Sequence, residues 1–146
     1  DGSLNPAANV LTGGAGNDIF KDVDLDDLMM PGGQIDGGTG TDLVHLAGLA
    51  SFNSTHTANV KNVEILDFEG GANTNISLSY NDVIGMTDSN HVLAVRGDVG
   101  DHLDASGWTQ VATGVAGDGG RTYDAYQATG VSGTATLYVE TDINVA

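Results

Sequence analysis

The sequence contains no cysteine, which excludes the disulfide bonds that hold many small extracellular domains together. Basic residues are also scarce. Four lysines and arginines face 20 aspartates and glutamates, which gives a formal net charge of −16. Nucleic-acid-binding proteins draw much of their affinity from lysine and arginine, so this charge argues against a nucleic-acid partner. It argues equally against an anionic membrane surface and favours cations as partners.

Long apolar runs are missing too. No stretch approaches the ~20 apolar residues needed to cross a membrane, so we expect no direct membrane insertion. Aromatic residues make up only 5% of the chain, whereas glycine occurs 22 times, and this composition favours turns and repetitive β structure over helical bundles. A chain of 146 residues is most simply one domain, and we expect it to be a monomer.

Signs of catalysis are few, and we predict a protein that is not an enzyme. The four histidines have no zinc-site spacing, there is no thiol, and no G-x-S-x-G segment is present. Asp98 and Asp101 could act as an acid and a base, but we favour turn residues or a second calcium site. Trp108, Tyr123 and Tyr126 could form a sugar-stacking platform, but packing in a core or cap is the favoured role.

Two glycine-rich segments of the sequence share one pattern. The first is GGAGNDIF, residues 13–20, and the second is GGTGTDLV, residues 37–44. Each has two glycines, a third glycine two residues later, an aspartate two residues further on, and then an apolar pair that begins a strand. We expect the glycines to form a tight turn with exposed carbonyls. Carbonyl and carboxylate oxygens are the hard ligands that calcium takes, so the pattern predicts a Ca²⁺ site.

Both segments resemble the calcium-binding nonapeptide G-G-x-G-x-D-x-U-x of RTX (repeats-in-toxin) proteins. In that family calcium lies between stacked turns, held by the aspartates and by backbone carbonyls. The resemblance therefore implies a ligand set of Asp18 and Asp42 with carbonyls from Gly13, Gly14, Ala15, Gly16, Gly37, Gly38, Thr39 and Gly40. We add Asp36, which leads into the second copy, to the candidate metal ligands.

The spacing of the two copies departs from the family pattern. The copies start 24 residues apart, whereas the family's tandem copies follow every nine residues, so the number of ions and the inward-pointing carbonyls stay open. The acidic run at residues 22–28 lacks the glycine and glutamate that an EF-hand loop requires at its sixth and twelfth positions. We interpret the run as a solvated excursion, with an extra calcium carboxylate as the alternative.

Strand-like runs near residues 19, 43 and 64 recur at intervals of about 20 to 24 residues, which suits stacked turns. We therefore predict an all-β fold, a right-handed parallel β-solenoid with a C-terminal antiparallel capping region. Residues 1–72 would form the calcium-binding turns and residues 73–146 the cap. We expect residues 53–59 to form a loop and Ser79 to cap a short helix that runs to Met86. Further strands are expected at residues 76–79, 92–95, 108–115, 123–128 and 134–139.

The second half also resembles the end of large bacterial RTX adhesins that are exported by type I secretion. The resemblance rests on residues 78–88 (LSYNDVIGMTD), the GDVGD turn at 97–101, the region of Gly107 and Trp108, YDAY at 123–126, and the terminal segments 135–139 and 142–145. In that family an uncleaved export signal lies at the C-terminus, so the resemblance implies that Ala146 is the natural end of the chain.

These observations lead to one main hypothesis and two alternatives. The main hypothesis is a calcium-dependent folding and type I secretion module of a secreted, cell-surface RTX adhesin, with the type I secretion machinery as its export partner. The first alternative is a calcium-dependent carbohydrate-binding module with a glycan ligand. The second is the tail of a secreted protease or lipase whose active site lies elsewhere in the parent protein.

Overall fold

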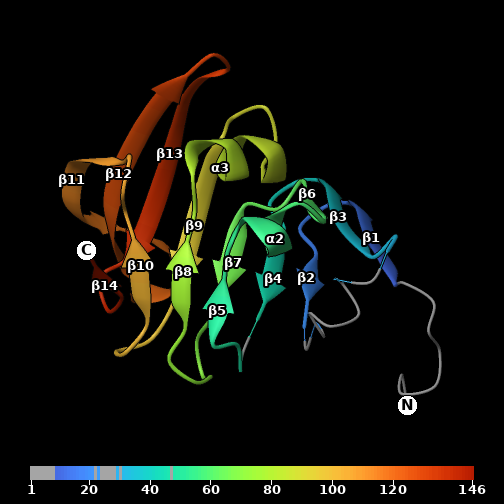
Figure 1. Ribbon diagram of the computed structural model, residues 1–146, viewed down its shortest axis with the longest axis horizontal. Coiled ribbons are helices and arrows are strands. Elements are labelled where there is room, and N and C mark those ends of the chain that lie inside the picture. Colours follow the sequence, from blue (N-terminus) through green and yellow to red (C-terminus); the bar gives the residue numbers. More distant parts are fainter. Residues whose placement is uncertain (1–8, 22, 24–28, 30, 47) are drawn as a thin grey trace.

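The computed structural model describes residues 9–146 other than 22, 24–28, 30 and 47. The described residues form three sheets whose strands come from distant parts of the sequence (Figure 1). The three-stranded sheet has the order β1 (Val10–Ala15), β3 (Gln34–Thr39) and β6 (Val60–Lys61). The four-stranded sheet has the order β14 (Asn144–Val145), β10 (His102–Asp104), β8 (Asn75–Ser77) and β5 (Ser51–Phe52).

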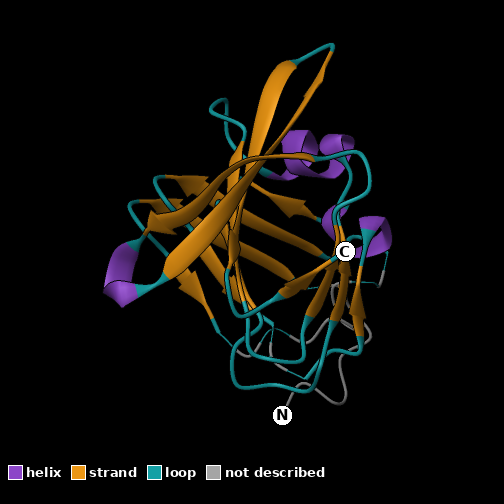
Figure 2. Cartoon of the chain, turned by 90° about the vertical axis from the view of Figure 1, so that its left-hand side faces the viewer, coloured by secondary structure: helices purple, strands orange, loops and turns teal. Residues whose placement is uncertain are grey.

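The seven-stranded sheet is the largest, and it is mixed. Its order is β11 (Thr109–Ala116), β12 (Thr122–Gly130), β13 (Gly133–Glu140), β9 (Val92–Arg96), β7 (Ile65–Asp67), β4 (Leu43–His45) and β2 (Ile19–Phe20). The strands from β13 to β2 pair in parallel, whereas β11, β12 and β13 pair antiparallel. Figure 2 shows the longest hairpin, β12–β13, rising above the strand layers at the top of the view.

Short helices connect some of the strands. They are α2 (Ser54–Thr57), α3 (Tyr80–Met86) and one 3-10 turn, η1 (Asp118–Gly120). Ser79 caps α3 by accepting a hydrogen bond from the backbone N–H of Asp82, so the predicted cap and helix are confirmed. The expected loop at residues 53–59 is wrong in part, because the Asn53 side chain accepts from the Thr55 N–H and starts α2.

The predicted single right-handed parallel β-solenoid is wrong. The described chain is mainly β, but it forms three sheets, one of which mixes parallel and antiparallel pairs, and it contains two short α-helices. Two physical features account for the difference. The segments between successive parallel strands are long enough to hold a helix and to send strands to different sheets. The glycine-rich links before β12 and β13 form hairpins, and β13 then pairs in parallel with β9 instead of closing a separate cap.

The core lies between the four-stranded and seven-stranded sheets, which Figure 1 shows one in front of the other. The four-stranded sheet contributes Phe52, Ile76 and Leu103, and each is almost fully buried. The facing sheet contributes apolar residues from several strands, including Leu66 on β7, Leu93 on β9 and Leu137 on β13. Burial of one such side chain stabilises the fold by roughly 1.5–3 kcal/mol. Ile35 on β3 and Val44 on β4 also belong to this core, so it holds the strands on both sides of the second glycine-rich segment.

Candidate metal centre

The two glycine-rich segments lie directly against each other. Strands β1 and β3 pair in parallel with Gly14 opposite Gly38, and the apolar pairs that follow, in β2 and β4, are also in register. The predicted tight turns are shorter than expected, because the first glycines continue the strands and the chain bends only at Gly16 and Gly40. Gly14 and Gly38 have φ values of 107° and 100°, a region that side chains rarely adopt.

The first glycine of each copy leaves room for a carboxylate. A Cβ atom built on Gly13 would lie 2.6 Å from Oδ2 of Asp18 and 2.5 Å from the carbonyl oxygen of Gly37. A Cβ atom built on Gly37 would lie 2.6 Å from Oδ2 of Asp42 and would overlap the carbonyl oxygen of Asn62. Each glycine therefore borders one carboxylate oxygen and one carbonyl oxygen, and any larger residue would displace them.

Further carbonyl oxygens face the space between the two segments. The carbonyl oxygens of Gly14 and Gly16 point at Gly38 and Gly40, respectively, and lie where side chains on those residues would have to stand. The side chain of Asn17 accepts a hydrogen bond from the Thr41 N–H at 2.9 Å. Backbone and side-chain oxygens thus converge here, and among the described residues no lysine or arginine forms an ion pair with them.

The aspartates of the two copies are linked through the backbone. Oδ1 of Asp42 accepts a hydrogen bond from the Asp18 N–H at 2.7 Å. Oε2 of Glu64 accepts from the Asp42 N–H at 3.0 Å, and its Oε1 accepts from the Asp88 N–H at 3.3 Å. Burial raises the pKa of Glu64, although these two hydrogen bonds oppose the shift. The result is a column of carboxylates in which Asp42 receives the amide of Asp18, and Glu64 receives the amides of Asp42 and Asp88.

Two oxygens in this column have no partner. Oδ2 of Asp18 and Oδ2 of Asp42 are buried without a hydrogen bond, and Asp42 as a whole is 0% exposed. A buried polar group without a partner costs about 1–3 kcal/mol, and a charged one costs more. A cation beside these oxygens would remove that cost, so both atoms point to a missing ligand.

The oxygens present fit calcium. Ca²⁺ takes six to eight oxygen ligands and accepts backbone carbonyls as readily as carboxylates. Within the described ranges, no group of three or more histidine, aspartate or glutamate side chains is placed to hold a metal ion. A site made of two carboxylates and several backbone carbonyls contains fewer than three such side chains. The fit to calcium therefore rests on Asp18, Asp42 and the glycine carbonyls around them.

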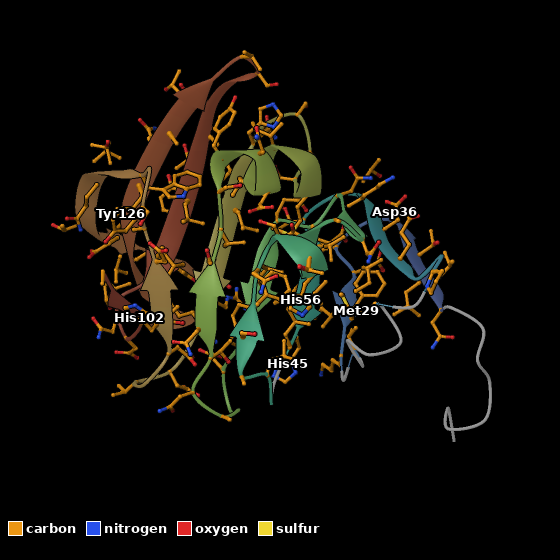
Figure 3. The ribbon with its side chains drawn as sticks, in the orientation of Figure 1. Met29, Asp36, His45, His56, His102 and Tyr126 are labelled. Carbon is orange, nitrogen blue, oxygen red and sulfur yellow. The ribbon has the colours of Figure 1, made fainter. Side chains whose placement is uncertain are left out.

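The structure brings together most but not all of the predicted ligands. Gly13 lies beside Asp18 and Gly37 beside Asp42, whereas Gly38 and Gly40 pack on the carbonyls of Gly14 and Gly16. Thr39 is exposed, and its carbonyl already accepts from the Gly16 N–H at 2.8 Å. Ala15 is exposed and pairs with Thr39. Asp36, labelled on β3 in Figure 3, accepts a hydrogen bond at Oδ1 from Nδ2 of Asn62 at 2.8 Å, so one of its oxygens is already engaged.

Asn62 and Glu64 are the residues that sequence reasoning missed. Glu64 accepts from the Asp42 N–H, and the Asn62 carbonyl oxygen lies beside Gly37, so both residues extend the column past Asp42. Their own segment has no paired glycines. Asn62 has a φ of 51°, a conformation that asparagine tolerates better than most residues. One signal could have found Glu64. An acidic residue directly precedes an apolar strand at Asp18, at Asp42 and again at Glu64.

Asp98 and Asp101 form a hydrogen-bonded turn. Oδ1 of Asp101 accepts from the Thr74 N–H and its Oδ2 accepts from the Asp98 N–H, both at 2.8 Å. Oδ2 of Asp98 accepts from the Gly70 N–H at 2.6 Å. Both oxygens of Asp101 are therefore satisfied by amides. The favoured interpretation as turn residues agrees with this geometry.

The aromatic platform considered above does not form. Tyr123 and Tyr126 are 5% and 7% exposed, and Trp108 donates its indole N–H to the Leu78 carbonyl at 2.7 Å while packing on the core. The acidic run at 22–28 falls almost wholly outside the described residues. Among the helices that the structure describes, none has the length and apolarity to cross a membrane.

Comparisons with protein-family models, with curated proteins and with solved structures found no match for this chain.

Proposed function

We propose that this chain is a non-catalytic module whose folding depends on calcium. The observation that supports the proposal most directly is the pair of buried oxygens, Oδ2 of Asp18 and Oδ2 of Asp42, that have no hydrogen-bond partner. They lie beside carbonyl oxygens in two segments that are in register. Bound calcium would supply the partner that these two oxygens lack.

Repulsion between acidic residues would make folding of the chain depend on calcium. At a net charge of −16, self-repulsion favours an expanded chain when cations are scarce. In particular, Asp18 and Asp42 must come together for β1 to pair with β3 and β2 with β4. Where calcium is plentiful, as outside cells, a bound ion offsets that repulsion. At a hundred times its dissociation constant, one ion stabilises the fold by about 2.7 kcal/mol.

Thermal unfolding with and without calcium tests this proposal. We expect millimolar CaCl₂ to raise the melting temperature above that measured in chelator, because only the folded chain collects the ligands. Asp18→Asn and Asp42→Asn should lose most of that increase. Asp101→Asn is the matched control. It should lower the melting temperature by a similar amount in both buffers, because amides satisfy that carboxylate. A melting temperature that does not respond to calcium would refute the proposal.

We further propose that the module is exported by a type I system and works outside the cell as part of an RTX adhesin. This part rests on the sequence resemblance of the second half alone. A reporter fused to the N-terminus of the chain and co-expressed with a type I exporter should reach the medium. A reporter retained in the cell would contradict export. The sequence upstream of this chain in its parent protein would separate an adhesin from a protease or lipase.

A further inference from the structure

The outward side of the four-stranded sheet carries polar side chains in rows. Alternate residues of each strand face the core, so their neighbours face outward. The strand register places Asn75 beside both Ser51 and His102, and His102 beside Asn144. These four residues form one continuous row across β5, β8, β10 and β14, which Figure 1 shows side by side.

A second, shorter row runs parallel to the first. Ser77 lies opposite Asp104, two positions along the same strands. We call the two rows together the polar face, made up of Ser51, Asn75, Ser77, His102, Asp104 and Asn144. A shallow depression of about 520 Å³ lies over the polar face, in the size range of small-molecule sites. Figure 3 marks His102 on β10, in the first row.

Most side chains of the polar face have unused hydrogen-bonding capacity. Within the part of the chain that the structure describes, Ser51, Asn75, Ser77, His102 and Asn144 make no side-chain hydrogen bond. Asp104 accepts from the hydroxyl and amide of Ser106, which leaves its Oδ2 free. Amide, hydroxyl and imidazole groups both donate and accept hydrogen bonds. The polar face therefore presents an ordered array of donors and acceptors.

The composition of this surface narrows the class of ligand. It contains no lysine or arginine, so it lacks the groups that hold phosphate or sulfate. Among the described residues, none of the large exposed apolar side chains lies on it, whereas protein interfaces have aromatic and apolar centres. Asp104 is its single acidic side chain, in a chain with 20 acidic residues, and Ala146 borders the depression as well. The polar face is thus a nearly neutral region of a strongly acidic molecule.

We propose that the polar face binds a neutral, hydroxyl-rich oligosaccharide laid across β5, β8, β10 and β14. Neighbouring strands are about 4.8 Å apart, and outward residues on one strand are about 7 Å apart. These intervals are comparable with the width of one sugar ring, so successive rings could each meet a new set of side chains. Asn75 and His102, in the centre of the first row, would make the principal hydrogen bonds.

This binding would not depend on the proposed calcium ligands. Gly13 and Gly37 lie in the three-stranded sheet, and Asp18 and Asp42 directly precede strands of the seven-stranded sheet. All binding measurements are therefore made in saturating calcium, and failure of either proposal leaves the other standing.

A glycan array with the 146-residue chain tests the proposal. The array carries cello-, manno- and malto-hexaose as neutral probes and a heparin oligosaccharide as the anionic comparison. We expect at least one neutral hexaose to bind. The double variant Asn75→Ala/His102→Ala should weaken that binding at least tenfold in calorimetric titration. Both residues lie at the surface, so its melting temperature should match that of the unaltered chain.

Asn81→Ala is the matched control, since Asn81 is an exposed asparagine on α3, outside the polar face. It should leave the affinity unchanged. The proposal is overturned if no neutral hexaose binds at about 1 mM, the weak end of useful affinity. Preferential binding of heparin would also overturn it, as would an equal loss of affinity in Asn81→Ala and the double variant.

Discussion

At the scale of single residues, this protein contains two kinds of carboxylate with buried oxygens. Asp101 has amide hydrogen bonds to both oxygens, whereas Asp18 and Asp42 each have one buried oxygen without a partner. All three lie beside a glycine on which a Cβ would meet the carboxylate at 2.6 Å. The three carboxylates thus have similar glycine neighbours. They differ in the partner of Oδ2, which is an amide for Asp101 and is absent for Asp18 and Asp42.

The first glycine of each copy should resist substitution. We expect Gly13→Ala and Gly37→Ala to lower the melting temperature and to weaken the response to calcium, because the new methyl group displaces Oδ2 of the neighbouring aspartate. Gly85→Ala is the control. A Cβ there meets nothing within 4 Å, and α3 should gain roughly 0.5–1 kcal/mol from the change. Thermal melts of the three variants in calcium and in chelator check this. Normal calcium stabilisation in Gly13→Ala and Gly37→Ala would contradict it.

The sequence predicted the centre of this site but not its lower end. The repeated glycine and aspartate spacing identified Asp18 and Asp42, because both backbone approach and carboxylate position follow from local spacing. Glu64 and Asn62 join the column only through pairing with segments more than 20 residues away. Asp36 was included among the candidate ligands because it precedes the second motif. The sequence did not show that its carboxylate accepts a hydrogen bond from Asn62.

At the scale of elements, local patterns predicted individual strands and one helix well. Strand β13 lies where a strand was expected, and its side chains alternate, with Ala135, Leu137 and Val139 buried. Glu140 breaks the alternation by being 7% exposed. It is buried because its Oε2 accepts from the Gly97 N–H and its Oε1 lies 3.5 Å from Arg121. The burial of Glu140 could not be predicted from the sequence of β13, because both partners lie in other segments.

The carboxylate of Asp82 joins α2 to α3. Desolvation alone would raise its pKa, but hydrogen bonds from Ser79, Thr57 and Ser54 outweigh desolvation and hold the pKa below the ordinary value of 3.8. Because the folded-state pKa is depressed, the stabilisation is fully present above pH 3.8 and is lost as the pH falls through the folded value.

Asp82→Asn should therefore reduce stability by about 1 kcal/mol at neutral pH. The difference from the unaltered chain should shrink as the pH is lowered below 3.8. Urea unfolding at a series of pH values measures it. Asp142→Asn, at an exposed position after β13, is the control and should show little effect at any pH. A deficit in Asp82→Asn that persists at the acid end would show that the carboxylate charge is not responsible.

Arg121 connects the loop before β12 to two other segments. Its guanidinium lies 2.7 Å from Glu69, after β7, and 3.5 Å from Glu140, in β13. The hydrogen bonds to Glu69 raise the pKa of Arg121, so it stays charged. Arg121→Gln should reduce stability by about 1–2 kcal/mol, because it leaves the largely buried Glu140 without its counter-charge.

Urea unfolding of Arg121→Gln, Arg121→Gln/Glu140→Gln and Lys61→Gln checks this. The double variant should recover part of the loss, since it removes the uncompensated charge. Lys61→Gln should be neutral, because Lys61 is exposed and, among the described residues, forms no ion pair. A double variant less stable than the single would contradict the account.

At the scale of the whole molecule, the sequence did not predict how the strands divide among sheets. Spacings of 20 to 24 residues correctly indicated parallel neighbours, as in the β2–β4 and β4–β7 pairs. They carried no information on whether β6 and β7, only four residues apart, belong to one sheet or to two. Sheet membership depends on which apolar faces meet in the core, a property of the assembled chain.

The acidic charge of the whole chain and the unpartnered oxygens of the column support the same proposal. A module with 20 acidic and four basic residues is poorly neutralised by its own side chains, and three ion pairs in the described region involve just two arginines. None of these three ion pairs involves Asp18 or Asp42. An external cation would supply the counter-charge that the described ion pairs leave out.

A crystal structure grown in calcium chloride would test the central claim most directly. The account predicts a cation within about 2.3–2.6 Å of Oδ2 of Asp18 or of Asp42, the calcium–oxygen distance. Carbonyl oxygens of the glycine-rich segments should complete its coordination shell. Electron density in which both Oδ2 atoms contact only water or protein groups, with no cation beside either, would contradict the account.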